Sequence, residues 1–476
     1  MEKGQSADAV SAVAHRWRGL LFGIAGVVLL SACATYHAKP LREEPPLAAG
    51  IESLQTAMPA PLKALNGGRE VNAADGLDLD EAAIVAVLNN PELRAKRMQL
   101  GVAGAQVFAA GLLPDPQLSA GVDKPTRNTS GTVNAWALGL SYEIIPLITR
   151  QARIDAQAGA QRKVRLDLLW QEWQVIQQAR SLAVDLSLEQ QRMALLNEMR
   201  SLYLERYQHS TAALAQGDIT LAVNGTDLTA LLDTLTQINQ LEQTINQTRH
   251  DFNLLLGLRP QVNVPVSPLP AYETLSAETL NAHLRSLSQR RPDLLALQAG
   301  YASQEAQVRA AILGQFPSLG ISVNGARDTS DVQTVGPGLT LSLPLFSGNR
   351  GNIAIERATR EQLREEYQAR LAQTATDIDR LRNLQDIVRR QQSRLDVYLP
   401  QLKMLVQRAS DAYTRGDIDA LTFLNMESTW VNKRLEKLSL LQAGWKNRIA
   451  LEALLAMPDY PAPSAPETAA VKETAP

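Results

Sequence analysis

The single cysteine of the 476-residue chain has the surroundings that point most directly to defined chemistry. It ends the run Leu30-Ser31-Ala32-Cys33, which follows a basic segment at residues 15–18 and an apolar stretch at residues 20–30. That stretch has roughly a dozen residues, whereas a membrane-spanning helix needs about 20, so it predicts the core of a signal peptide. The small residues before Cys33 match the bacterial lipobox, in which the cysteine sulfur carries a diacylglycerol.

The lipobox predicts a signal peptide at residues 1–32 and a mature chain that begins at Cys33, with a diacylglycerol and an N-acyl lipid as its covalent groups and no cofactor. Ala34 is not the aspartate that usually retains lipoproteins in the inner membrane, so sorting to the outer membrane is expected. The alternative is a buried, inert cysteine behind an ordinary cleavable signal.

Catalytic and metal-binding chemistry finds no support in the rest of the sequence. The five histidines are scattered, and there is no nucleophile elbow, no phosphate-binding glycine loop and no Cys/His ligand cluster. A formal net charge of -2 would not gather phosphates, so nucleic-acid binding is not expected. We therefore expect a protein that is not an enzyme and has no metal site.

An internal duplication organises the chain. Three pairs of segments match at an offset of 292 − 91 = 201 residues, and two more match at an offset of 416 − 217 = 199. The pairs are Asn90-Pro91-Glu92-Leu93 with Arg291-Pro292-Asp293-Leu294, Pro116-Gln117-Leu118 with Pro317-Ser318-Leu319, Leu140-Ser141 with Leu341-Ser342, Gln216-Gly217-Asp218-Ile219 with Arg415-Gly416-Asp417-Ile418, and Leu255-Leu256-Gly257-Leu258 with Leu454-Leu455-Ala456-Met457. Each half reads as helix, strand, strand, very long helix, turn, helix.

Two hydropathy periods identify these elements. Apolar and polar residues alternate in pairs of segments at about residues 116–144 and 317–345, which predicts two-faced strands of the length that a membrane barrel needs, about 9 to 11 residues. A seven-residue apolar period (Leu381, Val388, Leu395, Leu402, Ala409) predicts a long helix over 350–414 that packs side by side with others. Pro400 lies inside this pattern, so we expect a kink there and not a termination.

These elements define six segments. The signal peptide, 1–32, is followed by a lipidated extended tether at 33–78, a first repeat at 79–258, a connection at 259–280, a second repeat at 281–457 and a disordered tail at 458–476. Four strands cannot close a barrel, and an open edge in lipid would leave backbone groups unsatisfied, so several copies must join. Three copies would supply twelve strands. The expected fold class is an α+β membrane protein, a twelve-stranded trimeric barrel that continues into a helical coiled-coil tunnel.

The repeated element order resembles the TolC-type outer-membrane efflux family, lipoprotein branch. The likeness covers about residues 79 to 457 and rests also on Gly111-Leu112-Leu113-Pro114-Asp115-Pro116, Arg291-Pro292-Asp293-Leu294, Leu343-Pro344-Leu345-Phe346-Ser347-Gly348 and the lipobox. The family implies a homotrimer in the outer membrane, with a barrel and a periplasmic helical tunnel whose end closes at helix-turn-helix tips. It also implies a periplasmic adaptor and an inner-membrane pump, here expected to be of the RND type, as partners.

The resemblance assigns the tips to gating and adaptor docking. The equivalent turns are Gly217-Asp218-Ile219 and Gly416-Asp417-Ile418, in which glycine permits a left-handed turn and the aspartate is expected to cap the next helix. Several family members place acidic side chains a little later, where this chain has Thr422 and Asn425. Asp417 and Asp419 would then have to supply any acidic ring. Two well-built hairpin turns without a further role are the plainer alternative.

The expected function is a passive exit duct for drugs or metal ions in a tripartite efflux system. A type I protein-secretion duct is the alternative within the family, and a structural coiled-coil lipoprotein without a pore is the alternative outside it. Trp170 and Trp173, on the first long helix, are expected to pack and not to bind a ligand.

Overall fold

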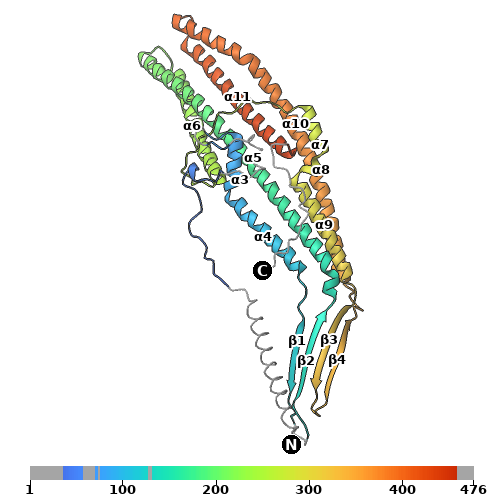
Figure 1. Ribbon diagram of the computed structural model, residues 1–476. Coiled ribbons are helices and arrows are strands. Elements are labelled where there is room, and N and C mark those ends of the chain that lie inside the picture. The colour runs from blue at the N-terminus through green and yellow to red at the C-terminus, as the bar shows by residue number, and fades with distance from the viewer. Residues whose placement is uncertain (1–35, 57–69, 73–75, 127–130, 458–476) are drawn as a thin grey trace. The chain divides into compact units, whose positions relative to one another are not determined.

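The computed structural model describes residues 36–56, 70–72, 76–126 and 131–457 (Figure 1). The signal peptide, Cys33 and the predicted tail after residue 457 lie outside this part. Residues 36–46 form a unit of their own, without helix or strand and exposed throughout.

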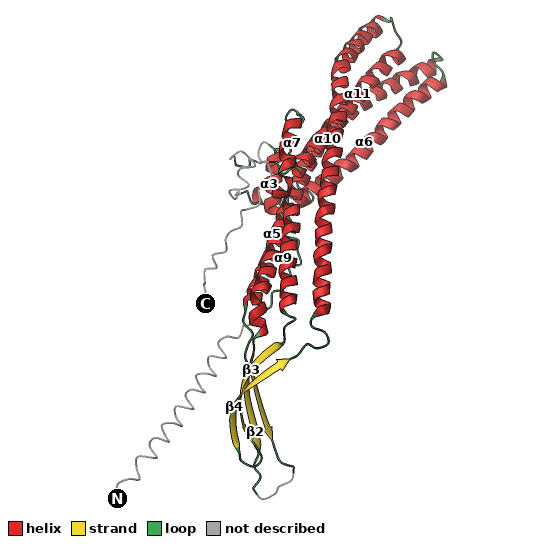
Figure 2. Cartoon of the chain, turned by 90° about the vertical axis from the view of Figure 1, so that its right-hand side faces the viewer, coloured by secondary structure: helices red, strands yellow, loops and turns green. Residues whose placement is uncertain are grey.

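The two halves contain the same elements in the same order. The first half consists of α3 (Leu79–Asn89), α4 (Pro91–Gly111), β1 (Gln117–Asp123), β2 (Ala135–Glu143), α5 (Ile145–Gln216) and α6 (Leu221–Leu255). The second consists of α7 (Ala277–Arg285), α8 (Leu287–Arg290), α9 (Pro292–Leu313), β3 (Ser318–Arg327), β4 (Gln333–Ser342), α10 (Arg350–Arg415) and α11 (Ala420–Leu454). The strands lie at one end of this body and the two hairpin turns at the other (Figure 2).

Four antiparallel strands form one sheet in the order β1-β2-β3-β4, so the central β2–β3 pair joins the two halves. Partners across the strands keep the two faces distinct. Leu118, Leu140 and Val323 follow one another on one face, whereas Ser119, Gly139 and Asn324 do so on the other. The apolar face is exposed, as at Leu118 (71%). Three strands reach nine or ten residues, but β1 stops at seven because Pro125, two residues after its end, cannot donate to a ladder.

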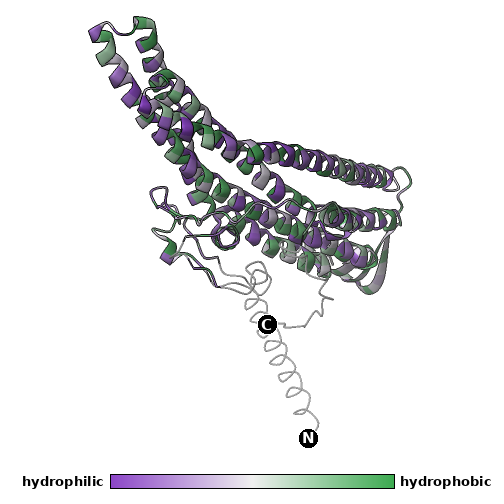
Figure 3. Ribbon diagram, turned by 90° about the horizontal axis from the view of Figure 1, so that it is seen from above, coloured by the Kyte–Doolittle hydropathy of each residue, from purple (hydrophilic) through white to green (hydrophobic). Residues whose placement is uncertain are grey.

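The long helices account for most of the chain. α5 has 72 residues and α10 has 66, and each is followed across a tight turn by a partner of 35 residues. α10 passes through Pro400 without ending, as the resumed apolar pattern predicted. Hydrophilic and hydrophobic residues are interspersed along the helices (Figure 3), and among the described residues no helix combines the length and the apolar character needed to cross a membrane.

The two halves interlock through α5, which packs against α9 and α11 of the second half as well as α3, α4 and α6 of its own. The largest apolar cluster gathers around α3 and α5, with Trp173 at 2% exposure and Trp170 packed beside it. Their rings lie 6.2 Å apart. The guanidinium of Arg291 lies 4.9 Å from the centre of the Trp170 ring. The residue that precedes α9 in the second repeat therefore packs against α5. Both tryptophans are packing residues, as expected.

Part of the predicted tether is not free. Ala48 donates its N–H to Gly257 O (2.9 Å), and Leu77 donates to Pro265 O (3.0 Å). Leu54 and Leu77 are buried in the largest apolar cluster. At its described residues near Ala48, Leu54 and Leu77, the segment expected to be a tether therefore packs against the rest of the body, through short pairings with Gly257 and Pro265 and through two apolar anchors. Similarly, α7 begins at Ala277, inside the segment predicted to be only a connection.

Candidate functional site: the helical tips

The two hairpin turns share one backbone geometry. Gly217 and Gly416 end their helices in the left-handed region, at φ 81° and 78°. In each turn the next N–H reaches back to close the helix end: Asp218 N–H donates to Ala213 O (3.0 Å) and Asp417 N–H donates to Ala412 O (2.9 Å). These are Schellman-type ends, which favour glycine because a Cβ strains a positive φ. The turn prediction at both glycines is confirmed.

The capping roles predicted for Asp218 and Asp417 are wrong. The N-caps of the following helices lie two residues later, at Thr220 and Asp419, which have the extended backbone that an N-cap needs. Asp419 accepts from Thr422 N–H (2.7 Å) and from its hydroxyl (3.1 Å), and these bonds hold the pKa of Asp419 below its usual range. Asp417 pairs instead with Arg415 Nε at 2.9 Å. Asn425 is exposed on α11.

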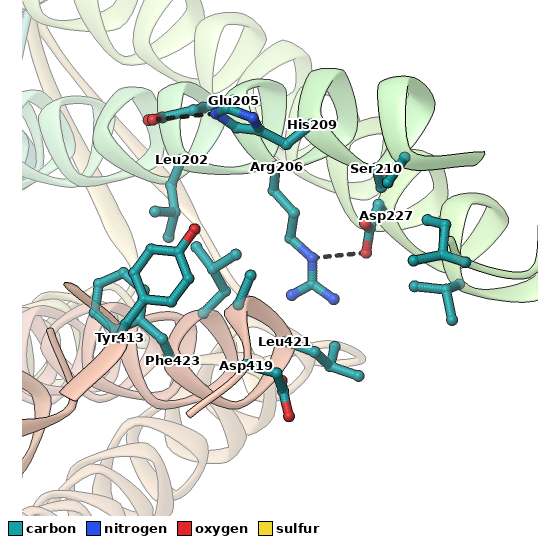
Figure 4. A pocket seen from close by; sticks show the side chains of 15 residues that line it. Leu202, Glu205, Arg206, His209, Ser210, Asp227, Tyr413, Asp419, Leu421 and Phe423 are labelled. Atoms are coloured by element: carbon teal, nitrogen blue, oxygen red, sulfur yellow. Dashed lines mark hydrogen bonds and ion pairs between the residues drawn. The ribbon is translucent and has the colours of Figure 1, made fainter. Parts of the chain in front are cut away.

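A groove of about 380 Å³ lies between the two hairpins near these turns (Figure 4). Of the predicted tip residues, only Ile219 and Asp419 line it. Its other lining residues come from all four tip helices. They are Leu202, Glu205, Arg206, His209, Ser210, Ala213, Val223, Asp227, Tyr413, Ala420, Leu421, Phe423 and Leu424. The groove thus joins two turns that are about 200 residues apart in the sequence.

The first hairpin is clamped by a buried polar pair. Arg206 Nε on α5 donates to Asp227 Oδ1 on α6 at 2.6 Å, and the side chains are 7% and 3% exposed. One turn closer to the tip, Asn224 Nδ2 donates to Ser210 Oγ (3.1 Å) and to Thr211 Oγ1 (3.0 Å). The guanidinium of Arg206 points into the groove (Figure 4). Since a buried charge needs a close partner, this pair fixes α5 against α6 at the groove.

The second hairpin is held by aromatic rings instead. Tyr413 on α10 and Phe423 on α11 stack with centroids 5.4 Å apart and an interplanar angle of 7°. The two duplicated hairpins therefore present different walls, one polar and one aromatic, to the groove between them.

Sequence reasoning missed Arg206, Asp227 and Phe423. A usable signal existed for the first two, because they lie at nearly equal distances from the Gly217 turn, 217 − 206 = 11 residues before it and 227 − 217 = 10 after it. Opposite charges at such positions face each other in a helical hairpin. No ligand set appears at this site, since the described residues contain no group of three or more His, Cys, Asp or Glu side chains placed to hold a metal ion.

Comparisons with known proteins bear on the family and the fold. The model of the outer membrane efflux protein family matches residues 284–457. The pyoverdine export outer membrane protein OpmQ of Pseudomonas aeruginosa is 27% identical over 85% of this chain and 90% of its own length. The cobalt-zinc-cadmium resistance protein CzcC of Cupriavidus metallidurans is 22% identical over 80% of this chain and 91% of its own. The solved structure of the outer-membrane channel OprN superposes with a TM-score of 0.68 and 17% identity, over 88% of this chain and 98% of that one.

The duplicated hairpins, the four-stranded sheet and the likeness to OprN define the fold of an outer-membrane channel protein. More particularly, residues 284–457 match the outer membrane efflux protein family, and over most of its length the chain is similar to the pyoverdine export outer membrane protein OpmQ and the cobalt-zinc-cadmium resistance protein CzcC.

Proposed function

We propose that three copies of this chain form a channel-tunnel, the passive exit duct of a tripartite efflux system. The observation that carries the proposal is the sheet. It has one continuous apolar face, and β1 and β4 each have a single strand neighbour in the described chain. In lipid each unpaired backbone group costs several kcal/mol, so these edges need partners. A β1 edge of one copy beside a β4 edge of the next closes twelve strands into a barrel with a polar lumen.

The helices support the same assembly. α10 carries apolar side chains that its own chain leaves exposed, among them Leu384 (37%), Ile387 (43%), Val397 (58%) and Leu405 (52%). Side chains of this kind along a helix with a seven-residue period suit packing against a neighbouring copy. The long helices of three copies would then continue the barrel as a periplasmic coiled-coil tunnel.

The lipid anchor is part of the proposal. Cys33 would carry a diacylglycerol and an N-acyl chain and hold the mature protein at the outer membrane, with a long periplasmic portion. Stable anchoring takes two signals, and a barrel together with lipid chains satisfies this condition. Intact mass measurement of the mature N-terminus tests it directly, since Cys33→Ser would remove the lipid mass while the barrel remains.

The tips are the proposed docking and gating site. A periplasmic adaptor would bind there, and an inner-membrane pump, most simply of the RND type, would supply the energy. OpmQ is named for pyoverdine export and CzcC for cobalt, zinc and cadmium resistance. These names support an exported small solute, an organic molecule or a metal ion, as the cargo of this channel.

Planar-bilayer conductance, with the oligomeric mass measured in the same detergent preparation, tests the duct. Stable trimers that give discrete channels are the expected result. Monomers without conductance, after lipidation has been verified by mass, would instead favour the alternative of a periplasmic scaffold without a pore. A type I secretion duct is the other alternative, and the pump that co-purifies distinguishes it: a proton-driven pump indicates efflux, and an ABC-type transporter indicates secretion.

A further inference from the structure

The two repeats contain the same elements but not the same neighbours. In the second repeat, α9 and α11 each pack closely against both long helices, α5 and α10. In the first repeat, the only long helix against which α4 and α6 pack closely is α5. Within the described part of the chain, α4 and α6 therefore each have one side without the long helix that covers the equivalent side of α9 or α11.

That side of α4 can be identified residue by residue. In the second repeat, the Ser303 hydroxyl of α9 donates to Ala156 O of α5 at 2.6 Å, and both residues are buried. The short helices match at an offset of 201, so Val102 of α4 is the counterpart of Ser303 (303 − 201 = 102). Val102 is 60% exposed. The same comparison gives Met98, 68% exposed, as the counterpart of the buried Ala299 (299 − 201 = 98).

The long helices match at the offset of the turns that end them, 416 − 217 = 199. A contact between each short helix and its own long helix supports both offsets. A Cβ on Gly104 of α4 would lie 3.4 Å from Gln161 Nε2 of α5. Their counterparts, Glu305 (104 + 201 = 305) and Arg360 (161 + 199 = 360), form an ion pair with Oε1 and Nη1 3.6 Å apart. Because α5 and α10 are uninterrupted helices, the offset of 199 applies along their length.

The exposed side of α10 complements that of α4. The counterpart of Ala156 on α10 is Ile355 (156 + 199 = 355), which is 64% exposed. The buried contact between Ala156 and Ser303 thus corresponds to two exposed apolar side chains, Ile355 and Val102. Within one chain these two side chains do not cover each other, since α4 does not pack closely against α10.

A second pair of surfaces, nearer the tips, follows the same rule. Met199 of α5 and Val431 of α11 are buried in one apolar cluster. Their counterparts are Tyr398 of α10 (199 + 199 = 398) and Leu232 of α6 (431 − 199 = 232), which are 63% and 52% exposed. At two separate levels of the helical body, apolar side chains are therefore exposed at the positions where the internal contact buries their counterparts.

We propose that α10 of each copy packs against α4 and α6 of the next copy, in the arrangement that α5 adopts against α9 and α11 within one chain. Ile355 then meets Val102 of the next copy and Tyr398 meets Leu232, so that apolar surface leaves water at both levels. A head-to-tail contact of this kind closes into a ring when the rotation between copies permits it. The proposal rests on the proposed function only in requiring that several copies assemble.

The sheet gives an independent check of the register. Leu140 of β2 pairs with Val323 of β3 within the chain. At the offset of 201, their counterparts are Leu341 of β4 (140 + 201 = 341) and Val122 of β1 (323 − 201 = 122). Both are exposed on the apolar face, at opposite edges of the sheet. The same rule applied to the strands therefore keeps the apolar face continuous from β4 of one copy to β1 of the next.

Cysteine cross-linking in outer-membrane fractions tests the helix contact. Val102→Cys combined with Ile355→Cys should form disulfides between copies on oxidation, and both positions are exposed, so the packing within the chain is unchanged. Heated, non-reducing gels should show covalent dimers and trimers that reduction returns to monomers. The matched control combines Val102→Cys with Ile387→Cys, another exposed apolar position of α10. It should stay monomeric, because 387 − 355 = 32 residues of helix span roughly 48 Å.

An internal reference shows that oxidation has worked. Leu140→Cys combined with Val323→Cys places cysteines at two paired positions of neighbouring strands, which are close enough for a disulfide. This variant should cross-link within one chain, so that the band stays monomeric while its thiols are protected from alkylation. Cys33 is retained in every variant, so any contribution from it is common to all of them.

Two results would refute the interface. One is the absence of covalent dimers with Val102→Cys and Ile355→Cys, although the internal reference is oxidised and the channels conduct. The other is equal cross-linking with Ile387→Cys, which would show that the disulfides record random collisions. Conductance separates the two proposals. Covalent trimers without conductance refute the exit duct and leave this interface intact, whereas conducting channels without the cross-link refute the interface alone.

Discussion

Arg206 and Asp227 are two full charges at positions where a helical hairpin would ordinarily pack apolar side chains. Their Nε–Oδ1 distance is 2.6 Å, and both side chains are more than nine tenths buried. Each charge therefore depends on the other as its partner. The desolvation of such a pair offsets much of its attraction, so its presence adds less stability than the loss of one partner removes. The pair specifies how α5 and α6 align at the groove.

This asymmetry gives a prediction. Arg206→Leu leaves the Asp227 carboxylate buried without a partner and should destabilise the first hairpin by about 3–5 kcal/mol. The double variant with Asp227→Leu should recover most of that loss. Hydrogen exchange of the α5 amides in residues 202–210 measures both.

The exposed pair Arg434–Glu198 offers a matched control, because Arg434→Leu should cost about 1 kcal/mol or less. If the double change accelerated exchange by the sum of the effects of Arg206→Leu and Asp227→Leu measured singly, the two charges would have no coupling and the proposed clamp would be wrong.

At single residues the sequence predicted conformation better than contacts. Both tip glycines and the packing role of Trp170 and Trp173 were predictable, because a left-handed turn and a large apolar ring have few alternatives. The caps at Asp218 and Asp417 were wrong by two positions, since the length of a turn depends on backbone geometry that residue type does not fix. The ion pair between Arg434 and Glu198 forms only when α11 lies against α5, a contact that no local pattern contains.

Among the elements, the helical hairpin is the one that both halves repeat, and each copy turns at a glycine with a left-handed backbone. Gly416 adopts φ 78°, and a Cβ built there would meet no atom within 4 Å, so a substitution there is opposed by backbone strain alone. Gly225, exposed in the second turn of α6, is the opposite case: it is helical and a Cβ built there would also meet no atom within 4 Å.

Replacement by alanine should therefore change stability in opposite directions at these two glycines. Gly416→Ala should destabilise the second turn by about 1–2 kcal/mol, the cost of the left-handed region, while Gly225→Ala should stabilise α6 by about 0.5–1 kcal/mol. Hydrogen exchange at the Gly416 and Asp417 amides, which close the turn, should accelerate roughly fivefold or more. Equal effects at both glycines would mean that the turn tolerates other backbone conformations.

The long helices were the most predictable elements. The predicted bounds 350–414 and the observed Arg350–Arg415 nearly coincide, because a seven-residue period sustained over many turns permits little else. The anchoring of Ala48, Leu54 and Leu77 was not predictable. Ala48 and Leu77 form backbone hydrogen bonds with Gly257 and Pro265, and Leu54 packs in the largest apolar cluster. These residues belong to no periodic pattern, so only the tertiary structure reveals their contacts.

On the scale of the whole molecule, the four-stranded sheet ends in two edge strands, β1 and β4, that have no further strand neighbour in the described part of the chain. Its two faces are chemically distinct, yet the apolar one is exposed, with Leu339 at 70%. Leu339 pairs with Ile321, whereas its neighbour Thr340 pairs with Gly320 on the opposite face. A scaffold surrounded by water would gain nothing from an exposed apolar face, whereas a barrel wall needs one side toward lipid and one toward water.

Adjacent positions of β4 test this requirement, because they differ in the face they present and in little else. If the sheet is part of a membrane barrel, Leu339→Arg places a charge in lipid and should cost about 2–4 kcal/mol near the midplane, whereas Thr340→Arg enters the lumen and should be tolerated. The yield of heat-resistant trimers in outer-membrane fractions measures the difference. Similar yields for both variants would show that neither face meets lipid. If both faces of the sheet were in water, arginine would be solvated equally well at either position.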